Sequence, residues 1–313
     1  MRAVSAEQIA QALPWPALID AIGKAFHDGV EAPARHHHSV NREDGEATIL
    51  LMPAWQTHGY IGVKMVNVFP QNTAYGLPAI SGTYLLSEGA HGRPVAYMDG
   101  SELTRRRTAA SSALACRELA QENASSLLMV GTGKLAPMLI EAHSTVRPIT
   151  QVRIWGRNPD NARALAEHYA DRYDTQVVTD LETASSQADI VSCATLSSDS
   201  LIKGAWLKTG SHLDLVGAFK PDMREADATC LHRGEVFVDT YAGAKGEAGD
   251  ILQAVTEGQF DFSEIRADIA QLLRGECTGR SSANAITVFK SVGASLEDLA
   301  AAIQVWQNLN DNP

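Results

Sequence analysis

The stretch LLMVGTGKLAPMLIEAH, residues 127–143, carries the pattern that decides the fold. An apolar run leads into Gly131-x-Gly133-x-x-Ala136, and residues with helical periodicity follow. We expect Gly131 to make a tight turn, Gly133 to let the backbone approach a pyrophosphate, and Ala136 to allow close packing of helix on sheet. Because a strand precedes the motif and a helix follows it, the stretch predicts a dinucleotide-binding βαβ unit.

Beyond residue 125 the chain alternates short apolar runs with helical segments. The expected strands lie in SSLLMVG, QVRIWG, TQVVT, ADIVSCAT, HLDLVGA and EVFVDT, with one helix to about His143 and another over 159–172. This alternation predicts a parallel sheet wound by right-handed crossovers.

The end of the second strand bears on the choice of cofactor. An NAD site usually carries Asp or Glu there, whereas this chain has Gly156, Arg157 and Asn158. A guanidinium suits the 2′-phosphate of NADPH, although Arg157 could instead be a solvated loop residue. We therefore expect NADPH as the cofactor, with NADH as an alternative.

The first hundred residues read as short helices followed by β-rich runs at 47–54, 60–69, 80–87 and 94–98. Turn-forming pieces separate the runs, so we expect an antiparallel arrangement. The runs are too few and too apolar on both faces for an open sheet in water, which predicts a homodimer that buries them. The segment SLEDLAAAIQVWQNL, 295–309, is expected to form a final helix that packs back onto another element.

Composition argues against several classes of protein. The 313 residues are 45% hydrophobic and 20% charged, which is typical of a globular chain long enough for two cores. A formal charge of −11 argues against a nucleic-acid partner. No apolar run approaches a membrane span, the amino-terminal segment lacks a signal-peptide core, and the four cysteines show no CxxC pairing. We expect a cytoplasmic protein with no nucleic-acid or membrane partner.

Three consecutive arginines, Arg105, Arg106 and Arg107, stand in ELTRRRTAASSALA, residues 102–115. If Thr104 caps a helix, Arg107 shares one stripe with the small and apolar residues at 110, 111 and 114, while the other two arginines point elsewhere. A guanidinium on a buried stripe needs an anion, and the nearby sequence supplies none. The partner is either a distant Asp or Glu or a bound ligand.

Two further cations raise the same question. Lys64 sits in VKMVNVF, a strand with apolar residues on both faces, where a lysine is costly without a partner or a wet cavity. Arg35 follows EAPA, and by itself it is interpreted as an exposed loop residue. With Arg107 they are three cations without obvious carboxylate neighbours, which predicts a pocket for a small anionic substrate.

Seven segments extend these observations over nearly the whole chain. In order they are PARHHHS, GVKMVNVFPQN, GLPAISGTYLL, GRPVAYMDGSELTRRRTAASSALA, VGTGKLAP, VGAFKPDMREAD and ITVFKSVGASLEDLAA. They resemble the ornithine cyclodeaminase/mu-crystallin family. The resemblance implies an α/β fold in which a Rossmann NAD(P)-binding domain, residues 117–289, is inserted into a smaller α/β substrate-binding and dimerisation domain, residues 1–116 and 290–313.

The resemblance also implies functional residues. The substrate-carboxylate positions fall on Arg35, Lys64 and Arg107, so the partner of Arg107 would be the substrate, while Arg105 and Arg106 are expected to be solvated. Lys64 would orient the substrate and tune or supply the proton on its ring nitrogen. The expected cofactor contacts are Gly131, Thr132, Gly133, Lys134, Leu135, Gly156, Arg157, Asn158, Thr195, Val216, Gly217, Ser291 and Val292.

One position departs from the cyclodeaminases of this family, which carry an aspartate where VGAFKPD places Phe219. A phenyl ring cannot accept a proton. The ketimine reductases of this family also lack the aspartate and share the PDxRE continuation. The resemblance therefore implies NADPH-dependent reduction of a cyclic ketimine carboxylate, Δ1-pyrroline-2-carboxylate or Δ1-piperideine-2-carboxylate, to L-proline or L-pipecolate. Ornithine cyclodeamination, an alanine-dehydrogenase-type reaction, and non-enzymatic binding of NADPH and a small ligand are the alternatives.

Two other polar groups have simpler interpretations. Adjacent His36, His37 and His38 point in alternating directions, and no second ligand cluster has metal spacing, so we expect no metal site. Glu247 and Asp250 in GEAGDI are interpreted as acidic residues at a helix start rather than as catalytic groups.

Overall fold

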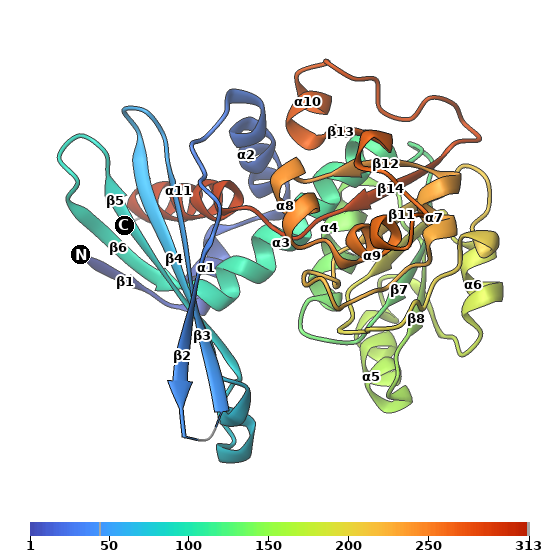
Figure 1. Cartoon of the computed structure of the whole chain (residues 1–313), viewed down its shortest axis with the longest axis horizontal. Coiled ribbons are helices and arrows are strands. Elements are labelled where there is room, and N and C mark those ends of the chain that lie inside the picture. The colour runs from blue at the N-terminus through green and yellow to red at the C-terminus, as the bar shows by residue number, and fades with distance from the viewer. Residues whose placement is uncertain (44, 312–313) are drawn as a thin grey trace. The chain divides into compact units, whose positions relative to one another are not determined.

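The computed structural model describes residues 1–43 and 45–311, and the chain divides into two compact units (Figure 1). The first unit comprises Met1–Thr108 and the segment from Ala294 onward, and the second comprises Ala109–Gly293. The helix α3 (Gly100–Leu119) runs through the division. The assignment of substrate binding to one part of the chain and of cofactor binding to the other stays a prediction.

The first unit contains a six-stranded sheet in the order β1-β6-β5-β4-β3-β2. The strands are β1 (Arg2–Val4), β2 (His36–Arg42), β3 (Gly45–Trp55), β4 (Tyr60–Val68), β5 (Ile80–Glu88) and β6 (Pro94–Asp99). The four β-rich runs correspond to β3 to β6, and their antiparallel pairing is confirmed. Two strands were not predicted from the sequence: β1, which is three residues long, and β2, which is mostly exposed and has no apolar alternation.

Helices cover one face of this sheet. They are α1 (Ala6–Ala12), which a capping box of Ser5 and Gln8 begins, α2 (Trp15–Asp28) and α11 (Ser295–Asp311). The final helix packs as its periodicity predicts, because α11 contacts β3, β4 and β5 as well as α1 and α2. Lys64 of β4 points to this covered face, where it reaches α11.

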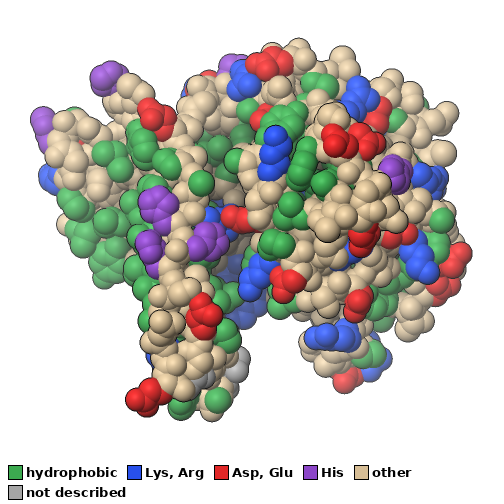
Figure 2. All heavy atoms as spheres, in the orientation of Figure 1, with side chains coloured by type: hydrophobic (Ala, Val, Ile, Leu, Met, Phe, Trp, Pro, Cys, Tyr) green, Lys and Arg blue, Asp and Glu red, His purple; other side chains and the backbone are tan. Residues whose placement is uncertain are grey.

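The opposite face of the same sheet carries exposed apolar side chains. Side chains alternate between the faces of a strand, so Ile61 and Met65 point away from the face of Lys64. Leu85 of β5 and Tyr97 of β6 oppose each other in the register on this side. The four apolar residues are between 37% and 45% exposed. We call them the open sheet face, and Figure 2 shows hydrophobic side chains gathered over the region of β5 and β6.

The second unit is built around an eight-stranded parallel sheet in the order β13-β12-β14-β11-β10-β7-β8-β9. The strands are β7 (Ser126–Val130), β8 (Gln151–Trp155), β9 (Asp174–Val177), β10 (Ile190–Cys193), β11 (His212–Leu215), β12 (Gly234–Val238), β13 (Ile265–Asp268) and β14 (Ile286–Lys290). The helices are α4 (Ala136–Val146), α5 (Pro159–Tyr169), α6 (Leu181–Gln187), α7 (Ala228–Arg233), α8 (Tyr241–Gly246), α9 (Gly249–Thr256) and α10 (Ile269–Leu273). The expected parallel sheet and its first six strands are confirmed, whereas β13 and β14 were not anticipated.

The strand order sets where a ligand can enter this unit. Strands β8 and β9 lie on one side of β7, and β10 and β11 lie on the other. The order therefore reverses between β7 and β10, and such a switch point leaves a crevice at the carboxyl ends of the strands. Within residues 1–43 and 45–311, none of the helices combines the length and the apolar character that a membrane span requires.

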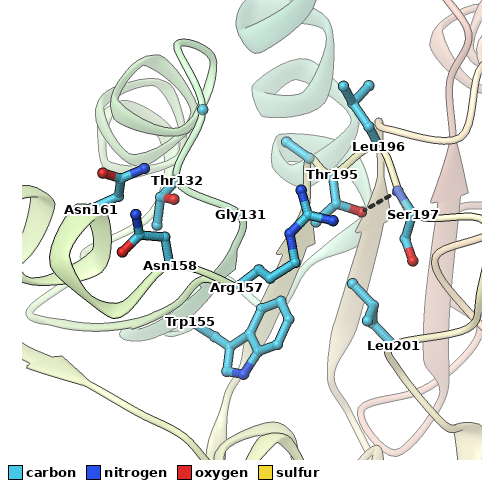
Figure 3. Close-up of a pocket in the computed structure, with 12 residues that line it drawn as sticks. Gly131, Thr132, Trp155, Arg157, Asn158, Asn161, Thr195, Leu196, Ser197 and Leu201 are labelled. Atoms are coloured by element: carbon cyan, nitrogen blue, oxygen red, sulfur yellow. Dashed lines mark hydrogen bonds between the residues drawn. The ribbon is translucent and has the colours of Figure 1, made fainter.

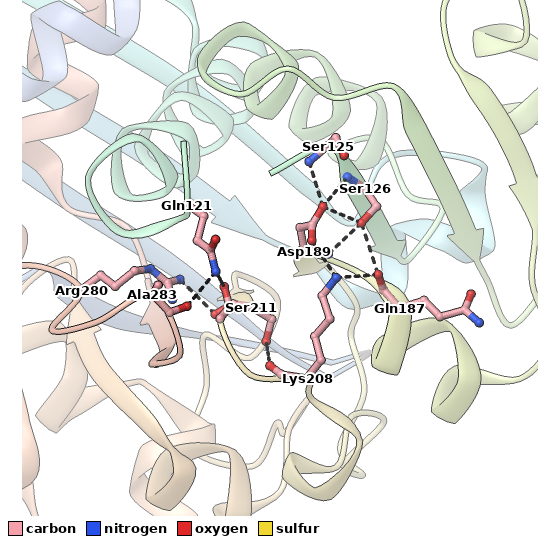
Figure 4. Close-up of polar contacts among 10 residues, drawn as sticks. Gln121, Ser125, Ser126, Gln187, Asp189, Lys208, Ser211, Arg280 and Ala283 are labelled. Carbon is pink, nitrogen blue, oxygen red and sulfur yellow. Dashed lines mark hydrogen bonds and ion pairs between the residues drawn. The ribbon is translucent and has the colours of Figure 1, made fainter. Parts of the chain in front are cut away.

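Asp189 ties together the amino-terminal ends of β7 and β10 (Figure 4). Its Oδ2 accepts hydrogen bonds from the backbone N–H groups of Ser125 and Ser126 at 2.9 and 3.0 Å, and its Oδ1 lies 2.7 Å from Lys208 Nζ. Burial raises the pKa of Asp189, but the hydrogen bonds prevail and lower it to about 2. The carboxylate is ionised at neutral pH. It stabilises the amino-terminal ends of β7 and β10, at the opposite end of these strands from the switch point.

Candidate active site

The helix that carries the three arginines begins earlier than a cap at Thr104 requires, because its first residue is Gly100. Asp99 Oδ1 accepts a hydrogen bond from the backbone N–H of Glu102 at 2.7 Å, so the expected cap is wrong and Asp99 has that role. Thr104 lies inside the helix, where its hydroxyl donates to the Gly100 carbonyl at 2.6 Å. The buried stripe is confirmed, because Arg107 and the three small or apolar residues on its face are buried.

Two carboxylates of α11 hold Arg107. Glu297 Oε2 lies 2.6 Å from its Nη1, and Asp298 Oδ1 lies 2.9 Å from its Nε. The other oxygen of Asp298 lies 2.7 Å from Lys64 Nζ, and the Lys64 side chain is 2% exposed. The expectation that these cations lack carboxylate neighbours is therefore wrong. It failed because the carboxylates stand 190 and 191 residues further along the chain, in the first turn of the final helix.

Burial and charge together set the protonation of this group. Loss of hydration lowers the pKa of Lys64 to about 8, with Asp298 opposing the change and Arg107 and Arg35 adding to it. Burial also acts against the charge on Arg107, but Asp298 and Glu297 raise the pKa of its guanidinium. We call these five residues the ion cluster. Lys64 and Arg107 pair with the carboxylates of Glu297 and Asp298, and the positive charge of Arg35 acts on Lys64 from nearby.

The structure brings together the three cations that sequence analysis assigned to a substrate. Arg35 is half-buried just before β2, and its charge acts on Lys64. Tyr84, which was not predicted from the sequence, opposes Lys64 on the neighbouring strand. The Tyr84 hydroxyl is buried and has no hydrogen-bond partner among the described residues. A Cβ at Gly62 would lie 1.9 Å from that hydroxyl, so glycine is required beside it.

The other two arginines have structural roles. Arg105 and Arg106 both bind Glu102, at 2.6 and 2.9 Å. Arg106 also donates to the Leu13 carbonyl at 3.2 Å, and its guanidinium lies 5.2 Å from the ring centroid of Trp15. The expectation of a solvated side chain is wrong for Arg106, which is 16% exposed, because the start of α2 covers it.

A cavity of about 290 Å³ opens in the second unit at the carboxyl ends of β7, β8 and β10, the switch point of the sheet (Figure 3). Six residues expected from the sequence line it: Gly131, Thr132, Gly133, Arg157, Asn158 and Thr195. Six others were missed: Trp155, Asn161, Ala194, Leu196, Ser197 and Leu201. The missed residues lie outside the glycine motif. Most of them follow the end of a strand, and this position is the feature of the sequence that could have predicted them.

The glycine turn beside this cavity leaves room for a close ligand. Gly131 has a φ of 121°, and a Cβ there would lie 2.5 Å from the carbonyl oxygen of Ala194, so only glycine fits. A Cβ at Gly133 would meet no atom within 4 Å, and the backbone there faces open space. The helix α4 begins three residues after Gly133, and its amino end favours an anion. The turn fits the pyrophosphate of a dinucleotide.

Arg157 is exposed and extends beside this cavity, whereas Asn158 also has a local role (Figure 3). The Asn158 side chain caps α5 by accepting a hydrogen bond from the backbone N–H of Asp160 at 2.9 Å. Seven other expected cofactor residues do not line the cavity: Lys134, Leu135, Gly156, Val216, Gly217, Ser291 and Val292.

Phe219 is half-buried in the loop after β11. The acidic residues of GEAGDI lie in different settings. Asp250 is in the first turn of α9, as expected, but it is also buried and lies 2.9 Å from Lys290 Nζ. Glu247 follows the last residue of α8.

The three adjacent histidines lie along β2, at the edge of the first sheet. The ring centroids of His36 and His38 are 6.3 Å apart. In the part of the chain that the structure describes, no three His, Cys, Asp or Glu side chains form a group that could hold a metal ion.

The chain is similar to known proteins over nearly its whole length. A model of the ornithine cyclodeaminase/mu-crystallin family matches residues 3–312. The Delta(1)-pyrroline-2-carboxylate reductase of Colwellia psychrerythraea is 36% identical, over 99% of this chain and 100% of that protein. The structure of Thermococcus litoralis Delta(1)-pyrroline-2-carboxylate reductase in complex with NADH and L-proline has a TM-score of 0.92 at 29% identity, over 99% and 98% of the two chains. An archaeal alanine dehydrogenase dimer with bound NAD has a TM-score of 0.91 at 28% identity, over 99% and 97%. The expected α/β fold with a Rossmann-type part is confirmed.

Proposed function

Since the chain belongs to the ornithine cyclodeaminase/mu-crystallin family, we propose that it reduces a small cyclic ketimine carboxylate with NADPH. The substrate is Δ1-pyrroline-2-carboxylate or Δ1-piperideine-2-carboxylate, and the product is L-proline or L-pipecolate. In either case the protein is an oxidoreductase that acts on a cyclic imine with a nicotinamide cofactor.

The observation that carries this proposal is the ion cluster of the first unit. It places three cations close together, two of them buried, and such a group can bind a substrate carboxylate, which Arg35 and Arg107 are assigned to hold. Glu297 and Asp298 hold Arg107 in one orientation, so little side-chain entropy is lost when the substrate binds. This fixed guanidinium would align the imine carbon for reaction, and such alignment accelerates a transfer between two bound partners.

Lys64 is the group that we assign to the proton. Reduction of the carbon–nitrogen double bond adds a hydride to carbon and a proton to nitrogen. When bound, the reduced nicotinamide supplies the hydride. Lys64, with a pKa of about 8, holds its proton at neutral pH and releases it at a small free-energy cost. Phe219 supplies no general base, so the water-activating step that cyclodeamination needs has no acceptor at that position.

The proposed NADPH preference rests on Arg157, which is exposed beside the cavity at the end of β8. No acidic residue stands in the Gly156–Asn158 turn to bond the ribose hydroxyls of NADH. The structure of the Thermococcus litoralis relative contains NADH, so the proposed preference for NADPH rests on Arg157 of this chain and not on that relative.

We also propose a homodimer that buries the open sheet face. The exposed apolar residues of β4, β5 and β6 lie on one face of the sheet, where a second copy of the chain would remove them from water. The archaeal alanine dehydrogenase of similar fold is a dimer, which supports a homodimer for this chain.

Two assays on the purified protein test the reaction. The first follows the absorbance of NADPH with the five- and six-membered ketimines and, separately, with pyruvate and ammonium. The second measures ammonia released from L-ornithine. We expect ketimine reduction and no ammonia. Ammonia release would identify a cyclodeaminase, reductive amination of pyruvate would identify an alanine dehydrogenase, and tight NADPH binding without turnover would identify a binding protein. Each of these three results overturns the proposal.

A further inference from the structure

The carboxylate of Glu225 lies between the loops that follow β10 and β11. Its Oε1 accepts hydrogen bonds from the backbone N–H of Thr195 at 2.6 Å and from the Thr195 hydroxyl at 2.8 Å. Its Oε2 accepts from the backbone N–H groups of Gly217 at 2.6 Å and Ala218 at 3.3 Å. One side chain thus holds four donors from two loops, and Glu225 is fully buried.

The two loops approach each other closely at this point. A Cβ on Gly217 would lie 2.1 Å from the carbonyl oxygen of Thr195 and 2.4 Å from Glu225 Oε1. The absence of a side chain at this glycine is therefore what lets the loops share one carboxylate. Hydrogen bonds to an ionised carboxylate are short and roughly twice as strong as neutral ones, so the charge on Glu225 fixes the spacing.

A second buried carboxylate, Asp250, binds the backbone at Glu225 and pairs with Lys290. Asp250 Oδ1 accepts from the backbone N–H groups of Glu225 and Ala226 at 2.7 and 2.9 Å, and its Oδ2 lies 2.9 Å from Lys290 Nζ. Asp250 and Lys290 are each about 1% exposed. Two buried carboxylates thus share one ammonium group, and the backbone donors of the loops stabilise the remaining negative charge.

We propose that Glu225 is a positioning residue for the nicotinamide cofactor, because its carboxylate fixes the two loops that carry Thr195, Val216 and Gly217. The inference rests on the proposed function, which uses a nicotinamide cofactor, and on the expectation from the family resemblance that these three residues contact it. Thr195 lines the cavity at the switch point, so a change in the loop spacing alters the wall of that cavity directly.

Protonation of Glu225 would weaken the hydrogen bonds that its carboxylate accepts from the two loops. Burial raises the pKa of Glu225 to about 7, with Lys290 opposing the change and Asp250 adding to it. Cys193 of β10 is a further titratable neighbour, and it stays a neutral thiol because burial raises its pKa. A protonated carboxyl presents an O–H toward donors that need an acceptor. Cofactor affinity therefore falls as the pH falls through about 7.

The test is a fluorescence titration of the full-length protein with NADH between about pH 6 and 8.5. NADH is the probe because it lacks the 2′-phosphate of NADPH, whose own pKa of about 6 would overlap the transition. We expect the wild-type Kd for NADH to rise as the pH falls. Glu225→Gln should bind NADH about tenfold or more weakly at high pH, with little dependence on pH, because the amide loses two charge-assisted acceptors.

Glu257→Gln is the matched control, because it makes the same chemical change at a partly exposed residue. Glu257 follows the last residue of α9 and pairs with Arg224. Thermal unfolding of each variant checks that the fold is kept. A wild-type NADH affinity that does not change with pH overturns the inference, even if the Glu225 variant fails to fold. Equal NADH affinity in the wild type and a folded Glu225→Gln also overturns it. Failure of the wild type to bind NADH or NADPH at all contradicts the proposed function itself.

Discussion

Replacement of Asp298 by asparagine tests the ion cluster most directly. The carboxylate is fully buried and lies 2.9 Å from Arg107 Nε and 2.7 Å from Lys64 Nζ. Asparagine keeps the shape of the side chain and removes the charge that the two cations share. The substitution therefore tests whether the charge of Asp298 keeps Lys64 protonated.

The size of the effect follows from the separation of the charges. At an effective dielectric constant of about 20, a unit charge about 4 Å away contributes about 4 kcal/mol, or about 3 pKa units. The amide dipole replaces part of this interaction, so we expect the pKa of Lys64 to fall by about one to three units from its value of about 8. At pH 8 a shift of one unit lowers the protonated fraction about fivefold, and a larger shift lowers it further.

Stability should change less than activity. Loss of one partner of a buried ion pair typically costs about 3–5 kcal/mol. Here Lys64 can release its proton and Arg107 keeps Glu297, so we expect the loss of unfolding free energy to lie below that range. In the wild type the folded state lowers the pKa of Lys64, so its contribution to stability rises with pH between about 8 and 10.5. A loss of activity above pH 8 is therefore not explained by unfolding through this group.

The assay is ketimine reduction followed by NADPH absorbance from about pH 6 to 9, because proton supply by Lys64 makes kcat/KM fall as the pH rises through about 8. Asp298→Asn should move this midpoint to lower pH. Glu297→Gln is the control: Glu297 lies 2.6 Å from Arg107, so we expect a higher KM with a nearly unchanged midpoint. An unchanged midpoint in a folded Asp298→Asn would refute the assignment of the proton to Lys64.

Three further predictions concern the cofactor, the substrate and the assembly. Arg157→Ala should weaken NADPH binding about ten- to a hundredfold and leave NADH nearly unchanged, and equal losses for both cofactors would contradict the assignment. Arg107→Lys keeps the charge but loses the planar fork, so KM for the ketimine should rise about tenfold or more, whereas Arg105→Lys should behave as wild type; identical kinetics of the two variants would show that Arg107 does not bind substrate. Light scattering should find a wild-type dimer that Leu85→Asp dissociates, because the substitution places a charge in the open sheet face, and a monodisperse wild-type monomer would exclude the proposed interface.

Local pattern was sufficient for much of the fold. The turn at Gly131, the parallel strands around it and the buried stripe of Arg107 all follow from residues within about four positions of one another, and such short-range periodicity is what helices and strands impose. Strand β2 could not be predicted in this way, because an exposed edge strand of polar residues has no alternating apolar face to bury. It also placed the helix cap at Thr104 rather than at Asp99, since either side chain can accept a backbone hydrogen bond.

The partners of the buried charges were decided only by the tertiary structure. Sequence identified Arg107 and Lys64 as cations that need an anion, but Asp298 meets them from a helix at the other end of the chain. Glu225 likewise became visible as a link between two loops only when β10 and β11 were paired side by side. The physical reason is that the periodicity of a segment determines which of its residues are buried. The contacts of a buried residue depend instead on which distant segment packs against it, and the sequence of a single segment does not contain that information.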